Sequence, residues 1–360
     1  MIKSLSLLFS FSLLFFLSCS PPAETTNTEP VQETVETIES VAEQIDGYVV
    51  ESFEDSKGNL WFGTLSKGAA KYDGESLKYI TTDDGLIGNA VIAIHEESDG
   101  TLWFITQSGI SIFDGKEFRN FNEKDGLNTS SVSQFFIDSK DRIWIGTWQG
   151  VCLFDGETCT EFPLPIPDVE LLPYQATVNW VTEISEDLEG NIWFGRDGYG
   201  ACKWDGENFS FITEDDGLYS NNIQVIHQDY KGQFWFGTRR AEMDHPDPSE
   251  RHGKGGLQVY DGQRMNGFTL PGLQNNDFYS LYEDRDGNYW ISALGIGLYK
   301  YNGITFDLVE VNDDYGKPVA VQNILHDSRG TYWFGCSGGL YRMDNGIVRN
   351  VTVEGPWQID

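Results

Sequence analysis

Short apolar runs, separated by Gly, Asp and Asn, cover the chain from residue 46 to its end. Between residues 91 and 121, Val91 to His95, Leu102 to Thr106 and Ile110 to Phe113 are largely apolar, and Glu117 to Phe121 mixes polar and aromatic residues. Runs of this length, bounded by turn residues, are typical of β-strands. The pattern therefore predicts a unit of four antiparallel strands.

Tryptophan marks seven copies of this unit. Six of the seven repeat tryptophans have Gly three residues earlier, and six have Asp six residues earlier; Asp141 and Glu97 are the respective exceptions. The repeat tryptophans are Trp61, Trp103, Trp144, Trp193, Trp235, Trp290 and Trp333, spaced by 41 to 55 residues. A period of this size indicates a repeat architecture.

The turn chemistry and the two apolar faces of each unit define the fold. Asp-Gly or Asn-Gly recurs at residues 73, 114, 155, 205, 261, 302 and 345, which predicts a type I′ turn in each outer hairpin. A four-stranded sheet with two apolar faces must be covered on both sides, and seven sheets arranged radially achieve this. We expect an all-β fold over residues 46–360, a seven-bladed β-propeller of four-stranded antiparallel blades, with the repeat tryptophans buried between blades.

The N-terminus has the features of an export signal. Lys3 precedes a mainly apolar run from Leu5 to Leu17, which is too short to span a bilayer comfortably. An apolar run, Ser18 and then Cys19 resemble a bacterial lipobox. That resemblance implies a lipoprotein signal peptide over residues 1–18 and lipidation of Cys19, with Ser20 favouring the outer membrane. An ordinary signal peptide with an incidental cysteine is the alternative.

Residues 19–45 are predicted to be a disordered acidic tether. Residues 20 to 45 contain six Glu and no Lys or Arg, and such a segment cannot bury enough apolar surface to fold alone. A short helix near its end is the alternative, because Val31, Val35, Ile38, Ala42 and Ile45 fall at helical spacing.

Charge narrows the classes of partner. The chain has 24 Lys and Arg against 56 Asp and Glu, a formal net charge of −32. Nucleic-acid binding needs a basic face, so this balance argues against a nucleic-acid partner and against an anionic membrane surface. We expect membrane association only through the lipid anchor, and a solvated acidic surface elsewhere.

The repeat resembles a known family. The linking segments Asp84 to Asn89, Asp125 to Ser130 and Asp216 to Asn221, with the strand Gly58 to Thr64 and Tyr72-Asp73-Gly74, are similar to the two-component regulator propeller repeat. In that family, propellers often form the periplasmic ligand-sensing part of membrane kinases. The resemblance implies the propeller fold and a binding role. No kinase sequence is recognised, so we expect a stand-alone lipoprotein of the bacterial cell envelope.

No cofactor or metal is predicted. Asp284 to Asn288 is the turn most similar to a calcium loop, but calcium needs six to eight oxygens, and Asp accepting backbone hydrogen bonds explains the turns better. His95 and His227 share one register on innermost strands, which favours packing or channel lining. A metal site at His245 and His252 in an inserted loop is left open.

Cysteine usage suggests one disulfide. Cys152 and Cys159 flank Asp155-Gly156, and a two-residue turn there would place them directly opposite each other on neighbouring strands, at a separation compatible with a bridge. Export would favour the bridge. Cys202 and Cys336 are expected to be buried as small apolar residues.

No catalytic residue is predicted. The chain has no Gly-x-Ser-x-Gly motif, and no cysteine has a motif that pairs it with a catalytic histidine. Streptogramin lyases and some polysaccharide lyases are also seven-bladed propellers, and the Trp-Phe-Gly strand is distantly similar to the lyase repeat. Their His/Glu and metal constellation cannot be mapped onto this chain, so a lyase-type enzyme is the alternative function.

The candidate binding site lies where two repeats depart from the pattern. Glu161 to Gln175 is a Pro-rich insertion before the fourth blade, and Arg239 to Lys254 is a charged insertion in the fifth. Both should emerge on one face, near each other. Arg with Trp and Tyr suits carboxylate or sugar recognition. We expect a glycan, a small molecule or an envelope protein as partner there, or else arginines that pair with local acids. The predicted ligand-binding residues are Trp148, Arg196, Tyr199, Arg239 and Arg240.

Overall fold

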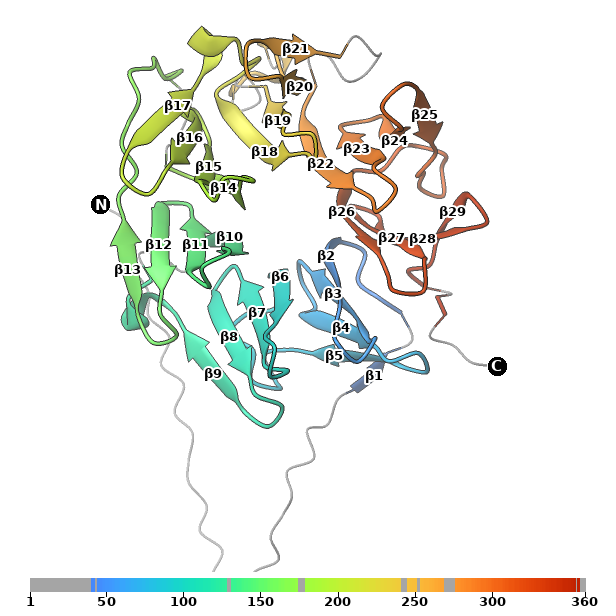
Figure 1. The fold of residues 1–360 in the computed structure, drawn as a ribbon. Helices are drawn as coiled ribbons and strands as arrows, with labels where there is room; N and C mark the ends of the chain where they lie inside the picture. Colours follow the sequence, from blue (N-terminus) through green and yellow to red (C-terminus); the bar gives the residue numbers. More distant parts are fainter. Residues whose placement is uncertain are drawn as a thin grey trace, which may run out of the picture. The chain divides into compact units, whose positions relative to one another are not determined.

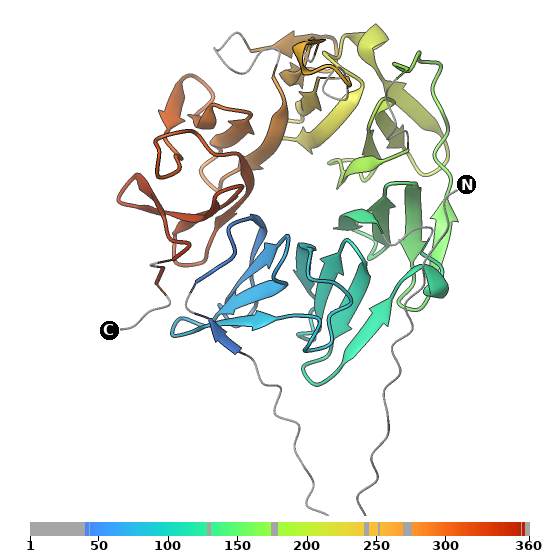
Figure 2. The ribbon, with the colours of Figure 1, turned by 180° about the vertical axis from the view of Figure 1, so that it is seen from behind.

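The computed structural model describes residues 40–42, 44–127, 131–173, 179–240, 245–250, 253–268, 276–353 and 355–356. The described strands form seven antiparallel sheets arranged in a ring, so the predicted seven-bladed propeller is confirmed (Figure 1). The same ring from behind shows the innermost strands gathered around the centre (Figure 2). Among the described residues, no helix has the length and apolar character needed to cross a bilayer.

Each blade is one contiguous stretch of chain, with its first strand innermost. Blade 1 contains β2 (Val49–Glu54), β3 (Leu60–Thr64), β4 (Ala69–Tyr72) and β5 (Leu77–Ile80). Blade 2 contains β6 (Val91–Glu96), β7 (Leu102–Thr106), β8 (Gly109–Phe113) and β9 (Phe118–Phe121). Blade 3 contains β10 (Val132–Ile137), β11 (Ile143–Thr147), β12 (Gly150–Phe154) and β13 (Cys159–Phe162). Blade 4 contains β14 (Val181–Glu186), β15 (Ile192–Arg196), β16 (Gly200–Trp204) and β17 (Phe209–Ile212).

The remaining blades follow the same order. Blade 5 contains β18 (Asn222–Gln228), β19 (Phe234–Arg239), β20 (Gly256–Tyr260) and β21 (Met265–Gly267). Blade 6 contains β22 (Phe278–Glu283), β23 (Tyr289–Ala293), β24 (Gly297–Tyr301) and β25 (Phe306–Val309). Blade 7 contains β26 (Val321–His326), β27 (Tyr332–Cys336), β28 (Gly339–Asp344) and β29 (Ile347–Asn350). Short 3-10 turns are η1 (Glu123–Asp125), η2 (Glu214–Asp216) and η4 (Pro248–Glu250).

A strand appears inside the segment expected to be a tether. β1 (Ser40–Ala42) pairs antiparallel with β5 and adds a fifth strand to the outer edge of blade 1. The chain here is extended rather than helical. Residues 1–39, including the predicted signal segment and Cys19, lie outside the described residues.

The repeat tryptophans fill the spaces between blades, as predicted. All seven are buried, and each packs into a hydrophobic cluster that contains residues of a neighbouring blade. Trp144, for example, meets Phe194 of blade 4 edge-on at 5.5 Å between ring centroids. Trp204 lies edge-on to Trp144 at 5.7 Å, so it also packs between blades 3 and 4.

The glycine of the Trp-x-Gly strand marks the close approach of successive blades. A Cβ on Gly63 would lie 2.6 Å from the carbonyl oxygen of Val91, the first residue of the next blade's innermost strand. At Gly335 the corresponding neighbour is Val49 of blade 1, at 3.0 Å, where the ring closes. Any larger side chain at Gly63 would push the two blades apart.

A second repeated contact joins neighbouring blades at the turn between the first and second strands of a blade. After the turn aspartate, Ser56 donates through its backbone N–H and its hydroxyl to Glu96 of blade 2, at 2.5 and 2.9 Å. Ser328 donates in the same way to Glu54, at 2.6 Å for both bonds, which links blade 7 to blade 1. These bonds help to close a ring whose blades exchange no strand.

The outer hairpins differ from the predicted type I′ turns in six blades. Type I′ needs positive φ at both central residues, and this holds at Asn345 and Gly346 of blade 7. In the other blades the Gly has positive φ but the preceding Asp or Asn does not, so the two central residues start one position later. In blade 3, for example, Asp155 donates its N–H to the carbonyl of Thr158 and accepts the N–H of Glu157 on Oδ1.

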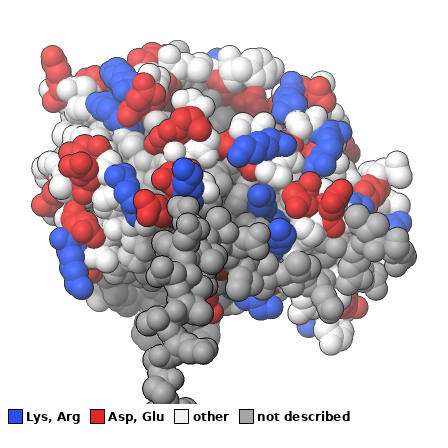
Figure 3. Space-filling model, turned by 90° about the horizontal axis from the view of Figure 1, so that it is seen from below, with Lys and Arg blue, Asp and Glu red and all other residues white. Residues whose placement is uncertain are grey.

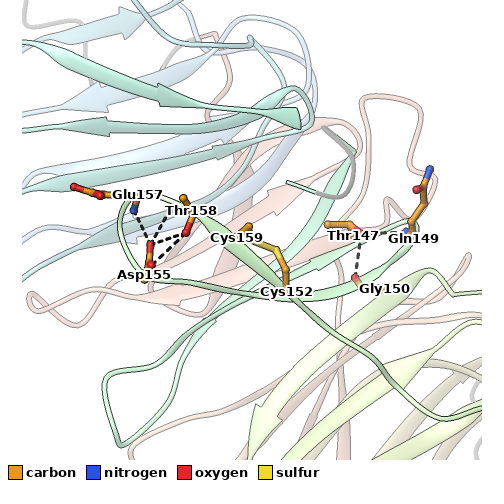
Figure 4. The surroundings of a disulfide bond; sticks show 8 residues. All are labelled: Thr147, Gln149, Gly150, Cys152, Asp155, Glu157, Thr158 and Cys159. Atoms are coloured by element: carbon orange, nitrogen blue, oxygen red, sulfur yellow. Dashed lines mark hydrogen bonds between the residues drawn. A yellow bond between two sulfur atoms is a disulfide. The ribbon is translucent and has the colours of Figure 1, made fainter. Parts of the chain in front are cut away.

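This shift corrects the predicted geometry of the disulfide. Cys152 and Cys159 are bonded, with Cα atoms 5.6 Å apart (Figure 4). They are not directly opposite, because Cys159 pairs with Phe154 and Cys152 pairs with Glu161 in the strand register. The bridge runs diagonally across the outer hairpin of blade 3, just before the Pro-rich insertion. Cys202 and Cys336 are free and buried, as predicted.

Acidic and basic side chains are interspersed on the side of the molecule seen in Figure 3. Several Lys and Arg residues lie over the repeat tryptophans. Lys203, for instance, lies 5.6 Å from the Trp193 ring and 3.7 Å from Asp187 Oδ2. Some of the few Lys and Arg residues therefore contact the tryptophan and the turn aspartate of their own repeat.

Candidate functional site

One ring of positions brings the predicted residues to the same face. In blades 3 and 4, the residue after the second strand donates its N–H to the residue before the innermost strand: Trp148 to Ser131 at 3.2 Å, and Asp197 to Trp180 at 3.1 Å. Arg239 of blade 5 pairs with Asn222 at the equivalent place. Trp148, Asp197 and Arg239 thus follow one another around the rim. We call this side of the propeller the loop face.

Trp148 and Trp180 form a stacked pair on the loop face. Their ring centroids are 4.8 Å apart and the planes are inclined by 16°. Trp148 is 47% exposed, whereas the seven repeat tryptophans are buried. The Nε1 of Trp180 is buried and has no hydrogen-bond partner among the described residues. The pair leaves an indole surface open to solvent at the boundary of blades 3 and 4.

Arg239 continues this cluster toward blade 5. Its guanidinium lies 6.0 Å from the Trp180 ring, and Nη2 donates to Asp197 Oδ1 at 2.8 Å. Asp197 is only 1% exposed, so the arginine balances a buried carboxylate. The guanidinium of Arg239 is therefore already engaged in an ion pair within the protein.

Arg240 is paired in the same manner. Nη2 lies 3.0 Å from Asp277 Oδ2, Nε lies 3.2 Å from Oδ1, and the backbone N–H of Arg240 also donates to Oδ1 at 3.0 Å. Asp277 is buried and precedes β22, the innermost strand of blade 6. This bidentate pair ties the start of the second insertion to the next blade.

Arg196 is buried beneath the Pro-rich insertion. Nη1 donates to the carbonyl of Pro165 and Nη2 to Oδ1 of Asn179, both at 2.7 Å, and Cζ lies 4.4 Å from the Tyr199 ring. The side chain is almost fully enclosed, and burial lowers the pKa of its guanidinium. No carboxylate pairs with it among the described residues. Arg196 and Tyr199 are placed to hold the insertion against blade 4.

The two insertions meet at a pocket, as expected from their positions. A cavity of about 420 Å³ has Glu170 and Leu172 of the first insertion on one side and Gly253 and Lys254 of the second on the other. The floor between them comes from blades 4 and 5. It consists of Gly198, Glu214, Tyr219, Ser220, Asn221 and Asn222.

All five predicted residues lie on the loop face over blades 3 to 5, but only Trp148 presents a large exposed surface. Asp277 escaped sequence reasoning. It occupies the position before an innermost strand that Trp180 also occupies, so aligning the repeats at that position would have found it.

Histidine positions agree with the register inferred from the sequence. His95 pairs with Trp103 and His227 with Trp235. His227 Nε2 lies 2.8 Å from Glu283 Oε2. Where the chain is described, no three His, Cys, Asp or Glu side chains are grouped closely enough to hold a metal ion. Part of the inserted loop, including His252, is outside the described residues.

A family model matches two segments of this propeller. Residues 126–149 and 272–295 match the two-component regulator propeller. These two segments of the chain thus carry the two-component regulator propeller repeat. The two segments lie at the entry to blades 3 and 6, and each ends just after a second strand.

Two similar proteins are a histidine kinase and an extracellular domain from a two-component system. Histidine kinase P4 of Formosa agariphila is 26% identical over 172 residues, 45% of this chain and 12% of the kinase. The extracellular domain of a Bacteroides protein assigned to hybrid two-component systems (B. thetaiotaomicron) superimposes with a TM-score of 0.66 at 18% identity, covering 83% of this chain and 40% of that one. The chain thus spans well under half the length of either protein.

A third similar protein is an enzyme. Virginiamycin B lyase from Staphylococcus aureus, solved in a catalytically inactive form with quinupristin, has a TM-score of 0.59 at 14% identity, covering 84% of this chain and 96% of the lyase. At this identity the likeness concerns the fold alone.

Proposed function

We propose that this chain is a non-catalytic binding module of the bacterial cell envelope, which takes a glycan or small molecule on the loop face over blades 3 to 5. One observation carries the proposal. Trp148 leaves half of an indole exposed while it is held flat against Trp180. Exposed, oriented aromatic rings are binding surfaces, because they offer large contact area at low entropic cost.

The surroundings of the indole pair favour a neutral, hydroxyl-rich ligand. Arg239 and Arg240 are already neutralised by Asp197 and Asp277, so they add hydrogen-bonding capacity rather than net charge. The adjoining pocket offers amide and carboxylate oxygens beside Lys254. A sugar stacks its apolar face on an indole and hydrogen-bonds such groups through its hydroxyls.

Kinship with sensor propellers supports a binding role without supplying the ligand. The kinase shares part of the sequence with this chain, and the two-component extracellular domain shares its fold. We propose an envelope location on the same ground, together with a lipid anchor at Cys19. Changing Cys19→Ala should release the protein into soluble fractions. A variant that stays membrane-bound in carbonate or high salt would contradict the anchor.

The binding proposal is tested by thermal-shift screening of purified protein against oligosaccharides and small metabolites, followed by calorimetry on any hit. Trp148→Ala should weaken binding of the hit about tenfold or more, with little change in melting temperature, because the side chain is half exposed. Tyr230→Ala is the matched control, since Tyr230 is 64% exposed in a turn on the opposite face. Equal affinity of the Trp148→Ala and Tyr230→Ala proteins would refute the site.

The same purified protein also tests two alternatives, a protein partner at the loop face and a lyase activity. An envelope protein would be retained by wild-type protein and lost with Trp148→Ala, while soluble glycans produce no shift. A lyase activity would convert a bound ligand, so mass spectrometry of the hit after prolonged incubation separates turnover from binding. Conversion that requires Trp148 would replace the binding-module proposal by the enzymatic alternative.

A further inference from the structure

The innermost strands enclose a second, separate cavity at the centre of the ring. It measures about 460 Å³ and is lined from β10, β14, β18, β22 and β26. The polar residues that line it are Gln134, Glu183, Ser185, Gln224, His227, Tyr279, Ser280 and Gln322. This cavity shares no lining residue with the pocket between the insertions.

Three polar side chains on the wall use N–H or O–H groups in hydrogen bonds to the backbone, so most of their remaining hydrogen-bonding groups are acceptors. Gln134 Nε2 donates to the carbonyl of Thr182 at 2.6 Å, and Gln224 Nε2 donates to the carbonyl of Ile223 at 3.1 Å. Ser280 donates its hydroxyl to the carbonyl of Val321 at 3.0 Å. The remaining capacity of these three side chains consists mostly of lone pairs on oxygen. A wall of this kind suits a ligand that donates hydrogen bonds.

Glu183 adds an unbalanced acidic group to this wall. Among the described residues its carboxyl group forms no ion pair and no hydrogen bond with another side chain, and its polar partner on the backbone is the N–H of Ile184. Burial raises the pKa of Glu183 to about 8. Glu51 occupies the same level of the ring in blade 1, since Glu51 pairs with Gly63 as Glu183 pairs with Gly195.

The other groups around Glu183 do not supply a cation. From β18 the cavity includes His227, which is already bonded to Glu283 of β22. From β22 it includes Tyr279, a neutral phenol whose pKa is raised by burial. The lining from β10 and β26 contributes amides rather than titratable polar groups. None of these described groups therefore balances an ionised Glu183, and a bound cation would do so.

We propose that the central cavity binds a small organic cation, a protonated primary amine, with the Glu183 carboxylate as its counter-ion. An ammonium group has three donors and one positive charge, which match the acceptor oxygens and the carboxylate. Where Glu183 is protonated before binding, its proton passes to the buffer as the ammonium takes its place, so charge balances within the cavity. This site is independent of the loop-face proposal.

The test uses propylammonium as the probe and 1-propanol as its neutral counterpart. Calorimetry on the full chain should show propylammonium binding that strengthens about tenfold or more from pH 6 to pH 8.5, with proton release visible as a heat that depends on the buffer. Glu183→Gln should abolish the pH dependence and weaken binding about tenfold or more. 1-Propanol should not bind.

Glu186→Gln is the matched control. It removes a charge from the same strand, at a position bonded to Ser139 of blade 3, and Gln228 already fills the equivalent place in blade 5. This variant should bind propylammonium like the wild type. Trp148→Ala should also bind it normally, which separates this site from the loop face.

Several outcomes would overturn the proposal: equal affinity in Glu183→Gln and wild type, equal binding of propanol and propylammonium, or no propylammonium binding at any accessible concentration. If Glu183→Gln fails to fold, the buffer-dependent proton release of the wild-type protein still decides. A heat of binding that is the same in all buffers at pH 7 would contradict the role of Glu183.

Discussion

The indole N–H of Trp193 donates a hydrogen bond of 2.8 Å to Oδ2 of Asp187, six residues earlier in the chain. The other oxygen of the same carboxylate accepts the backbone N–H groups of Glu189 and Asn191. One side chain thus closes the first turn of blade 4 and fixes the tryptophan that packs against blade 5. Five further blades repeat this bond at 2.8 to 3.1 Å.

Removing this carboxylate should be costly. In Asp187→Ala, the indole N–H and two backbone N–H groups lose their acceptor in a buried turn, so we expect a loss of about 3 kcal/mol of unfolding free energy. Chemical denaturation followed by tryptophan fluorescence measures this. Asp205→Ala is a suitable control, because Asp205 caps an exposed hairpin turn. Similar losses in the two variants would contradict the special role of the buried aspartate.

Blade 2 supplies the reverse experiment. There Glu97 replaces the aspartate, and Nε1 of Trp103 is buried without a hydrogen-bond partner among the described residues. Glu97→Asp should restore the missing bond and stabilise the propeller by about 1 kcal/mol. Glu97→Gln keeps the longer side chain and should bring no gain. A melting temperature for Glu97→Asp at or below that of Glu97→Gln would show that side-chain length is not the cause.

The repeated aspartate and tryptophan also show what the sequence could and could not predict. The Asp-to-Trp spacing predicted the blades and the buried tryptophans, because the period and the apolar pattern are local properties of the chain. The hydrogen bond between the two side chains was not predicted, since a turn aspartate was expected to bond only to the backbone. The hairpin register was wrong by one position in six of the seven blades, because the Asp or Asn before the Gly bonds to the following N–H groups instead of adopting positive φ.

The positions of the candidate site residues were predictable, but their contacts were not. Insertion lengths and the register of second strands placed Trp148, Arg196 and Arg239 on one face. The arginines are bonded to Asp197, Asn179 and Asp277, which lie in other loops or in a neighbouring blade. No spacing in the sequence indicated these pairings or which of the side chains would be buried. The central carboxylates Glu51 and Glu183 had no distinguishing motif, because only ring closure surrounds them with protein.

The disulfide should stabilise the outer hairpin of blade 3. It closes a short loop between residues 152 and 159, for which the chain-entropy model gives about 2 kcal/mol. Replacing both cysteines by serine should lower the unfolding free energy by about this amount. Adding reductant should lower the unfolding free energy of the wild type and leave that of the double variant unchanged. A reductant effect of equal size on the double variant would contradict the assignment, since the other described cysteines are free.

Arg196 should matter more for the order of the insertion than for the blades. Its two hydrogen bonds reach Pro165 and Asn179, on either side of the segment that enters blade 4. In Arg196→Ala we expect faster amide hydrogen exchange in residues 161–173, while the strands of blades 1 and 2 exchange as in the wild type. Arg264→Ala, which removes an exposed arginine, is the control. Unchanged exchange in the insertion would show that Arg196 does not hold it.

The two central carboxyl groups should make the propeller less stable in alkaline solution. Burial raises the pKa of both Glu51 and Glu183 to about 8, well above the value of about 4.3 expected in the unfolded chain. A raised pKa means that the folded state holds the proton more tightly, so the stabilisation is complete below pH 4 and is lost as the pH rises toward 8. We expect the melting temperature to fall from pH 5 to pH 9. The double variant Glu51→Gln, Glu183→Gln remains neutral over this range and should show a clearly flatter profile by differential scanning calorimetry. Identical profiles for the two proteins would mean that the folded state tolerates these charges, and that the ring leaves them better solvated than the geometry indicates.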